Sequence, residues 1–178
     1  GLDAAVSLAP ARFDLHQAYS RVAVQSLTEG PEIADSDAAR AELIASAFGH
    51  LDDAQAVAGE DPDLLMDRAE LLSASGQPEE ALSLYDRILE FYPRSFRAHL
   101  GLGLAASQVN QLDRAEQAWR TAADLAPGDP RALVNLGILY ERAGDPDAAA
   151  ESFSAALEVD PGDSAASAGL ERVTVPTD

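Results

Sequence analysis

The chain of 178 residues contains no cysteine and no lysine. The absence of cysteine excludes disulfides, thiol catalysis and cysteine-ligated zinc sites. The absence of lysine leaves 12 arginines as the only basic residues besides histidine, against 31 acidic residues, for a net charge of −19. Affinity for phosphate backbones and anionic lipid headgroups comes largely from Lys and Arg. We therefore expect neither nucleic-acid binding nor direct binding to an anionic membrane surface.

The acidic residues are spread along the whole chain, which has two interpretations. One is a solvated acidic surface typical of a bacterial, salt-adapted protein, and the other is electrostatic steering of a basic partner. No apolar run approaches the roughly 20 residues needed to span a bilayer. The first residues, GLDAAVSLAP, have no basic leader and no long apolar stretch, so no intact signal peptide is expected. A soluble protein is expected, with cytoplasm and periplasm both open.

Catalytic and ligand-binding motifs are also scarce. His16, His50 and His99 are the only histidines, and no two have a metal-binding or catalytic spacing. The stretch GLGLAA at 101–106 resembles a dinucleotide fingerprint, but it lies within a predicted helix rather than after a strand. The two DPD stretches, 61–63 and 145–147, lack the oxygen-ligand pattern of a calcium loop and are interpreted as helix caps. We predict no catalytic, cofactor or metal site, and hence a non-enzyme.

What the chain does contain is an internal repeat of 34 residues. Helix-ending residues recur at this spacing in three copies: Gly76, Asn110 and Gly144, followed by Pro93, Pro127 and Pro161. Small and bulky residues recur with them: Ala81, Ala115 and Ala149, with Tyr85, Trp119 and Phe153. Gly103 and Gly137 lack a side chain where a partner helix would otherwise collide, so the repeat predicts closely packed helical hairpins.

These residues resemble the tetratricopeptide repeat family. The third copy matches the family pattern best, with Leu133, Leu136, Gly137, Tyr140, Ala149, Phe153, Ala156 and Pro161. The middle copy has His99, Leu102, Gly103, Ala106, Ala115, Trp119, Ala122 and Pro127. The first copy is weaker, with Leu65, Arg68, Ala69 and Leu72 in its first helix but with Ala81, Tyr85 and Pro93 in place. The resemblance implies an all-α fold, a right-handed α-solenoid of antiparallel helix hairpins.

On this basis the chain divides into an N-terminal extension, a degenerate helical pair, three repeats, a capping helix and a tail. The predicted ranges are 1–11, 12–58, 62–95, 96–129, 130–163, 164–173 and 174–178 in that order. In the helical pair, Ala47, Leu51 and Ala54 fall where the second helix of an earlier repeat would place them. The capping helix is expected to cover the last apolar face.

The resemblance also implies that the first helices line a concave groove that binds a partner. The repeat positions that contact ligands in the family correspond here to a predicted partner groove of Met66, Glu70, Arg97, Leu100, Leu104, Gln108, Arg131, Val134, Asn135, Ile138 and Arg142. Some family members hold a peptide carboxylate with a Lys/Asn/Arg clamp. This chain has no lysine and has Gly101 where an asparagine is needed, so such a clamp is not expected.

An apolar strip within the groove, Leu100, Leu104, Val134 and Ile138, is predicted to lie outside the packing seam. Left bare, it would be an unusual exposed patch. It either binds an amphipathic helix or extended peptide, or is filled by the chain's own N-terminal helix through Phe13, Leu15, Tyr19, Val22 and Leu27. We therefore expect a protein–protein interaction module: a scaffold, adaptor, assembly factor or accessory subunit. The alternatives are the regulatory module of a larger enzyme and a self-associating structural subunit, so a homo-oligomer stays open.

Overall fold

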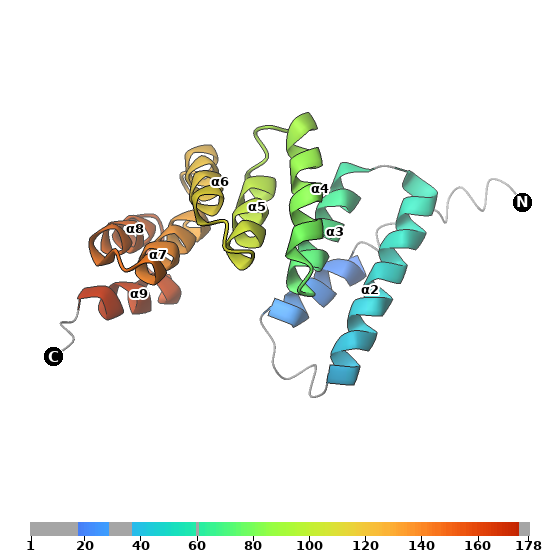
Figure 1. Ribbon diagram of the computed structural model, residues 1–178, viewed down its shortest axis with the longest axis horizontal. Coiled ribbons are helices and arrows are strands. Elements are labelled where there is room, and N and C mark those ends of the chain that lie inside the picture. The colour runs from blue at the N-terminus through green and yellow to red at the C-terminus, as the bar shows by residue number, and fades with distance from the viewer. Residues whose placement is uncertain (1–17, 29–36, 60, 175–178) are drawn as a thin grey trace, which may run out of the picture. The chain divides into compact units, whose positions relative to one another are not determined.

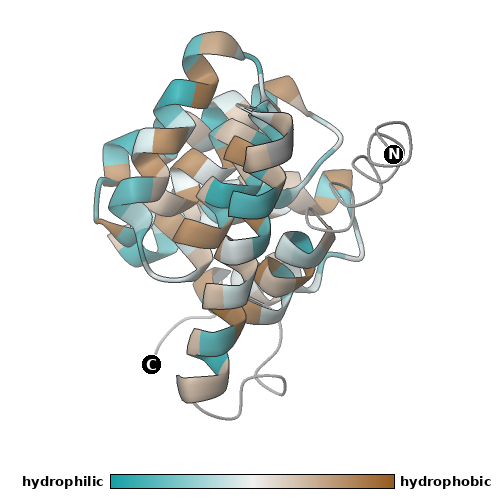
Figure 2. Ribbon diagram, turned by 90° about the vertical axis from the view of Figure 1, so that its right-hand side faces the viewer, coloured by the Kyte–Doolittle hydropathy of each residue, from teal (hydrophilic) through white to brown (hydrophobic). Residues whose placement is uncertain are grey.

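All regular structure in the described part of the chain is α-helical. The computed structural model describes residues 18–28, 37–59 and 61–174. Residues 18–28, called the N-terminal helix below, are followed by α2 (Asp37–Ala58), α3 (Pro62–Ala74), α4 (Pro78–Phe91), α5 (Phe96–Gln108), α6 (Leu112–Leu125), α7 (Arg131–Ala143), α8 (Pro146–Val159) and α9 (Ser164–Thr174). Hydrophobic and hydrophilic segments alternate along these helices (Figure 2), as expected of helices that bury one face.

The helices end where the repeat predicts. Gly76, Asn110 and Gly144 have φ angles of 84°, 61° and 78°, the left-handed conformation that terminates a helix. The three helices that precede Pro93, Pro127 and Pro161 end at Phe91, Leu125 and Val159, two residues before each proline, since a proline disfavours helical geometry in the residue before it.

The DPD stretches are helix caps, as predicted. The carboxylate of Asp61 accepts hydrogen bonds from the backbone N–H groups of Asp63 (2.8 Å) and Leu64 (3.2 Å). The carboxylate of Asp145 accepts one from the N–H of Ala148 at 3.0 Å. Each carboxylate satisfies donors that the first turn of a helix leaves without a partner.

Contacts divide the chain into two compact units, Gly1–Ile88 and Leu89–Asp178, and the division falls within α4. In the first unit, a cluster of small and branched apolar side chains joins the N-terminal helix to α2 and α3. Its members are Ala23, Ala47, Leu51, Ala54, Leu64 and Leu71, with Val24, Leu27, Leu43 and Phe48 packed against them. A polar contact accompanies this cluster: Arg21 of the N-terminal helix lies 3.3 Å from the carboxylate of Asp67 on α3, which is only 1% exposed.

The second unit consists of two helical hairpins and α9 (Figure 1). Helix α5 packs on α6 and α7 on α8, while the first helices α5 and α7 also contact each other. Helix α9 packs on α7 and α8, where Ala166 joins Val134, Ala149, Phe153 and Ala156 in one buried cluster. No helix among the described residues is both long and apolar enough to cross a membrane.

Candidate functional site

Helices α5 and α7 each carry a stripe of exposed or half-buried residues. In each stripe the residues are spaced three or four apart, so they share one side of their helix. The stripe of α5 is Arg97, Leu100, Leu104 and Gln108, and that of α7 is Arg131, Asn135, Ile138 and Arg142. These eight residues are called the α5–α7 face below. Because α5 and α7 are in contact, the two stripes lie on neighbouring helices of one compact unit.

Close packing behind the face holds both helices in place. A Cβ atom built on Gly103 of α5 would lie 2.6 Å from Cδ1 of Trp119 on α6, and one built on Gly137 of α7 would lie 2.6 Å from Cδ1 of Phe153 on α8. The indole N–H of Trp119 also donates a hydrogen bond to the carbonyl of Leu100, at 3.1 Å. The predicted pairing of small with bulky residues is therefore confirmed, and it turns the stripes away from the second helices.

Two large apolar side chains at the middle of the face are open to solvent. Leu104 is 43% exposed and Ile138 is 38% exposed, while Leu100 is half-buried. Isolated exposed apolar residues are ordinary on protein surfaces. Here the two occupy the same repeat position on helices that touch, so the exposure recurs with the repeat.

Two of the predicted groove residues are covered instead. Val134 is 8% exposed and belongs to the buried cluster of the second unit, so the expectation that it lies outside the packing seam is wrong. Met66 on α3 is 5% exposed, and Glu70 on the same helix is half-buried. Met66 and Glu70 belong to the first unit, so they are not part of the α5–α7 face.

The arginines of the face differ in their surroundings. Arg131 forms a bidentate pair with Asp129, with Nε 2.9 Å from Oδ1 and Nη2 2.7 Å from Oδ2, and this hydrogen bonding lowers the pKa of the Asp129 carboxyl. The guanidinium of Arg131 also lies over the ring of Phe96, 5.2 Å from its centroid. The side chain of Arg142 is exposed and forms no hydrogen bond or ion pair with the rest of the described chain.

The N-terminal helix was the alternative occupant of the apolar strip. Of its five proposed contact residues, Phe13 and Leu15 lie outside the described residues. Leu27 packs against the core of the first unit. Tyr19 and Val22 are 38% and 61% exposed. The buried side of this helix therefore packs against α2 and α3 within the first unit.

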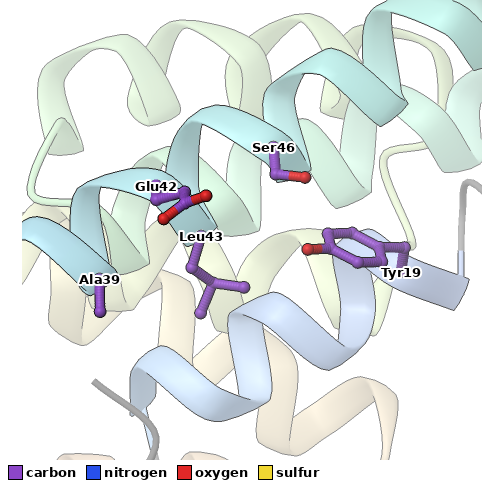
Figure 3. Close-up of a pocket in the computed structure, with 5 residues that line it drawn as sticks. All are labelled: Tyr19, Ala39, Glu42, Leu43 and Ser46. Carbon is purple, nitrogen blue, oxygen red and sulfur yellow. The ribbon is translucent and has the colours of Figure 1, made fainter. Parts of the chain in front are cut away.

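The first unit has a cavity that the sequence did not indicate. It measures about 270 Å³ and lies between the N-terminal helix and α2, lined by Tyr19, Ala39, Glu42, Leu43 and Ser46. Figure 3 shows the hydroxyl of Tyr19 pointing toward the side chains of α2. Such a cavity depends on how two helices meet, and no local pattern in either helix predicts it.

The histidines and carboxylates that the structure describes were candidates for a metal site. Within the described ranges, no three His, Asp or Glu side chains are placed to hold a metal ion. His99 is half-buried, and its Nε2 lies 3.0 Å from the carbonyl oxygen of Pro93, near the end of the preceding repeat. Its position is thus accounted for by packing and one backbone contact.

Comparison with known families gives two matches, both described as tetratricopeptide repeat. One covers residues 62–105 and the other residues 100–166. A comparison with curated proteins found no match.

Solved structures of low sequence identity share the fold. The Cut9–Hcn1 hetero-tetramer of APC/C aligns at 19% identity over 76% of this chain, with a TM-score of 0.69, and the chain spans only 28% of that protein. YrrB, described as a tetratricopeptide repeat protein with an unusual peptide-binding site, aligns at 20% identity over 85% of this chain and 84% of its own, with a TM-score of 0.65. MamA 41-end from Desulfovibrio magneticus RS-1 aligns at 20% identity over 89% and 82%, with a TM-score of 0.65. The fold class is an all-α helical-repeat solenoid.

Proposed function

Because the chain belongs to the tetratricopeptide repeat family, we propose that it is a non-enzymatic interaction module that binds a partner protein on the α5–α7 face. The observation that carries this proposal is the exposure of Leu104 and Ile138 at the same repeat position of two adjacent helices. A partner that covers both side chains removes apolar surface from water, which favours binding by roughly 25 cal/mol for each Å² buried.

The form of the face supports an amphipathic helix or an extended peptide as the bound element. The apolar middle, Leu100, Leu104 and Ile138, is short and has polar side chains at either end. Peptides that bind such surfaces present apolar anchors on one side and polar residues around them. A scaffold, adaptor, assembly factor or accessory subunit of a larger complex uses this kind of contact.

The test is a charge placed in the middle of the face. In affinity capture from the source cell, Leu104→Asp should lose the partner recovered with the wild-type chain, while its helical circular dichroism stays unchanged. Phe91→Asp is a matched control, because Phe91 is also a large exposed apolar residue, 75% exposed, but lies on α4 outside the face. Loss of the partner in the Phe91→Asp variant only, or its retention in both variants, would contradict the proposal.

A further inference from the structure

The two first helices of the second unit have few acidic residues compared with the chain as a whole. Helix α5, FRAHLGLGLAASQ, contains one arginine and no acidic residue. Helix α7, RALVNLGILYERA, contains two arginines and a single acid, Glu141. The whole chain has 31 acidic residues and 12 arginines. The α5–α7 face itself includes three arginines and no carboxylate.

The one acid of α7 is already neutralised by a partner within the unit. Arg172 of α9 binds Glu141 in a bidentate pair, with distances of 2.7 Å (Nε–Oε1) and 2.8 Å (Nη2–Oε2). The hydrogen bond from Arg172 lowers the pKa of the Glu141 carboxyl. A fork of this kind satisfies both carboxylate oxygens at once. Glu141 therefore does not offset the charge of Arg142 beside it.

The cations are placed at the two ends of the apolar middle. Arg97 begins the stripe of α5, and Arg142 ends the stripe of α7, one helical turn beyond Ile138. Arg131 is matched by Asp129, whereas Arg142 has no carboxylate partner among the described residues. An exposed guanidinium next to an exposed apolar side chain is suited to a carboxylate that flanks an apolar anchor.

We infer that the α5–α7 face selects an acidic amphipathic segment of another protein, with its apolar anchors on Leu104 and Ile138 and a carboxylate at Arg142. The inference rests on the proposed function and specifies the partner of the same face. It is opposite to the basic partner that the net charge of −19 suggests. At physiological ionic strength the Debye length is about 8 Å, so distant acids are largely screened and the charges at the contact decide selectivity.

The experiment compares two synthetic peptides on the full chain. Both carry leucines at helical i, i+4 and i+7 positions, and the flanking residues are glutamates in one peptide and lysines in the other. Trp119 is the only tryptophan and contacts α5, so its fluorescence reports binding next to the face. We expect the glutamate peptide to bind about fivefold more tightly at physiological ionic strength, since one exposed ion pair contributes up to about 1 kcal/mol.

Charge reversal separates contact at the face from attraction to the whole chain. Arg142→Glu should weaken binding of the glutamate peptide about fivefold and strengthen binding of the lysine peptide. Arg87→Glu makes the same charge change on α4 in the other unit and should leave both affinities unchanged. Equal or stronger binding of the lysine peptide, or equal effects of the two reversals, would overturn the inference.

The outcomes also distinguish this inference from the proposed function. If Leu104→Asp abolishes binding of both peptides while the lysine peptide is preferred, the face binds partners but the acidic selectivity is wrong. If neither peptide binds and Leu104→Asp has no effect on any complex, the proposed function fails as well. If light scattering shows self-association that Leu104→Asp abolishes and neither peptide inhibits, a second copy is the occupant and the inference is overturned.

Discussion

Replacing Gly137 with alanine should destabilise the protein, although alanine is the better helix former. The added Cβ would lie 2.6 Å from Cδ1 and Cε1 of Phe153, about 1 Å inside the 3.5–4.0 Å of a normal carbon contact. The Phe153 ring is fully buried and has little room to retreat, because the Cβ position of Gly169 on α9 lies 2.6 Å from Cε1 of the same ring.

The expected magnitude follows from two opposing contributions. Overpacking a filled core costs about 1–3 kcal/mol, and the enclosed ring places this site near the upper value. Alanine in place of glycine within a helix contributes about 1 kcal/mol in the opposite direction. We therefore expect a net loss of about 2 kcal/mol, or a fall in Tm of about 4–8 °C for a chain of this length.

A matched control has the same chemistry without the clash. Gly49 lies inside α2, and a Cβ atom there would have nothing within 4 Å. Gly49→Ala should stabilise the protein by about 0.5–1 kcal/mol. Both variants are compared with the wild type by urea and thermal denaturation followed by circular dichroism. If Gly137→Ala stabilises as much as Gly49→Ala, the close approach of α7 to the Phe153 ring is wrong.

A second substitution checks the cause of the destabilisation. In a Phe153→Leu background, the smaller side chain leaves room for the added methyl group. Gly137→Ala should then cost at least about 1 kcal/mol less than it does beside phenylalanine, a coupling of the size expected for residues in contact. Additive effects of the two substitutions would contradict the steric explanation.

Three further predictions concern polar contacts between helices. Arg172→Gln should raise the pKa of Glu141, measured by carboxyl NMR, because the pairing with Arg172 lowers this pKa in the folded protein. The ion pair therefore stabilises the fold above the ordinary glutamate pKa of roughly 4.3, and this stabilisation is lost as the pH falls through the folded-state pKa. Tyr140→Phe should cost about 1 kcal/mol. It should also remove a step above the ordinary tyrosine pKa of roughly 10 from an absorbance titration, since partial burial and a hydrogen bond to a glutamate raise the pKa of the Tyr140 phenol. Arg21→Gln should cost about 1–3 kcal/mol and accelerate amide exchange in the N-terminal helix, because it removes an ion pair from the buried carboxylate of Asp67; unchanged exchange would contradict a role of this pair in docking the helix.

The predictable part of the fold is the part that the repeat constrains. The spacing of glycines and bulky residues indicated that Gly137 lies where a partner helix comes close, and in the structure that helix places Phe153 there. It also indicated where helices end, since Asn110 and Gly144 recur at the one position that needs a left-handed conformation.

The candidate site was less predictable, because burial depends on what covers a position. Val134 and Leu100 occupy the same place in successive repeats, yet Val134 is buried in a cluster that includes Ala166 of α9. The register assigns a residue to a side of its helix, but the next helix along the chain decides its exposure. The pairing of Arg172 with Glu141 likewise joins residues of different helices, and neither helix predicts it alone.

The most direct test of the central claim is site-specific photo-crosslinking in the source cell. A photoreactive residue is introduced in place of Leu104 or Ile138, and in place of Asp124 as a control that is exposed on α6 outside the face. If the α5–α7 face binds a partner, positions 104 and 138 should crosslink to the same protein and position 124 should not. Crosslinks to that protein from position 124 alone, or from all three positions equally, would contradict it.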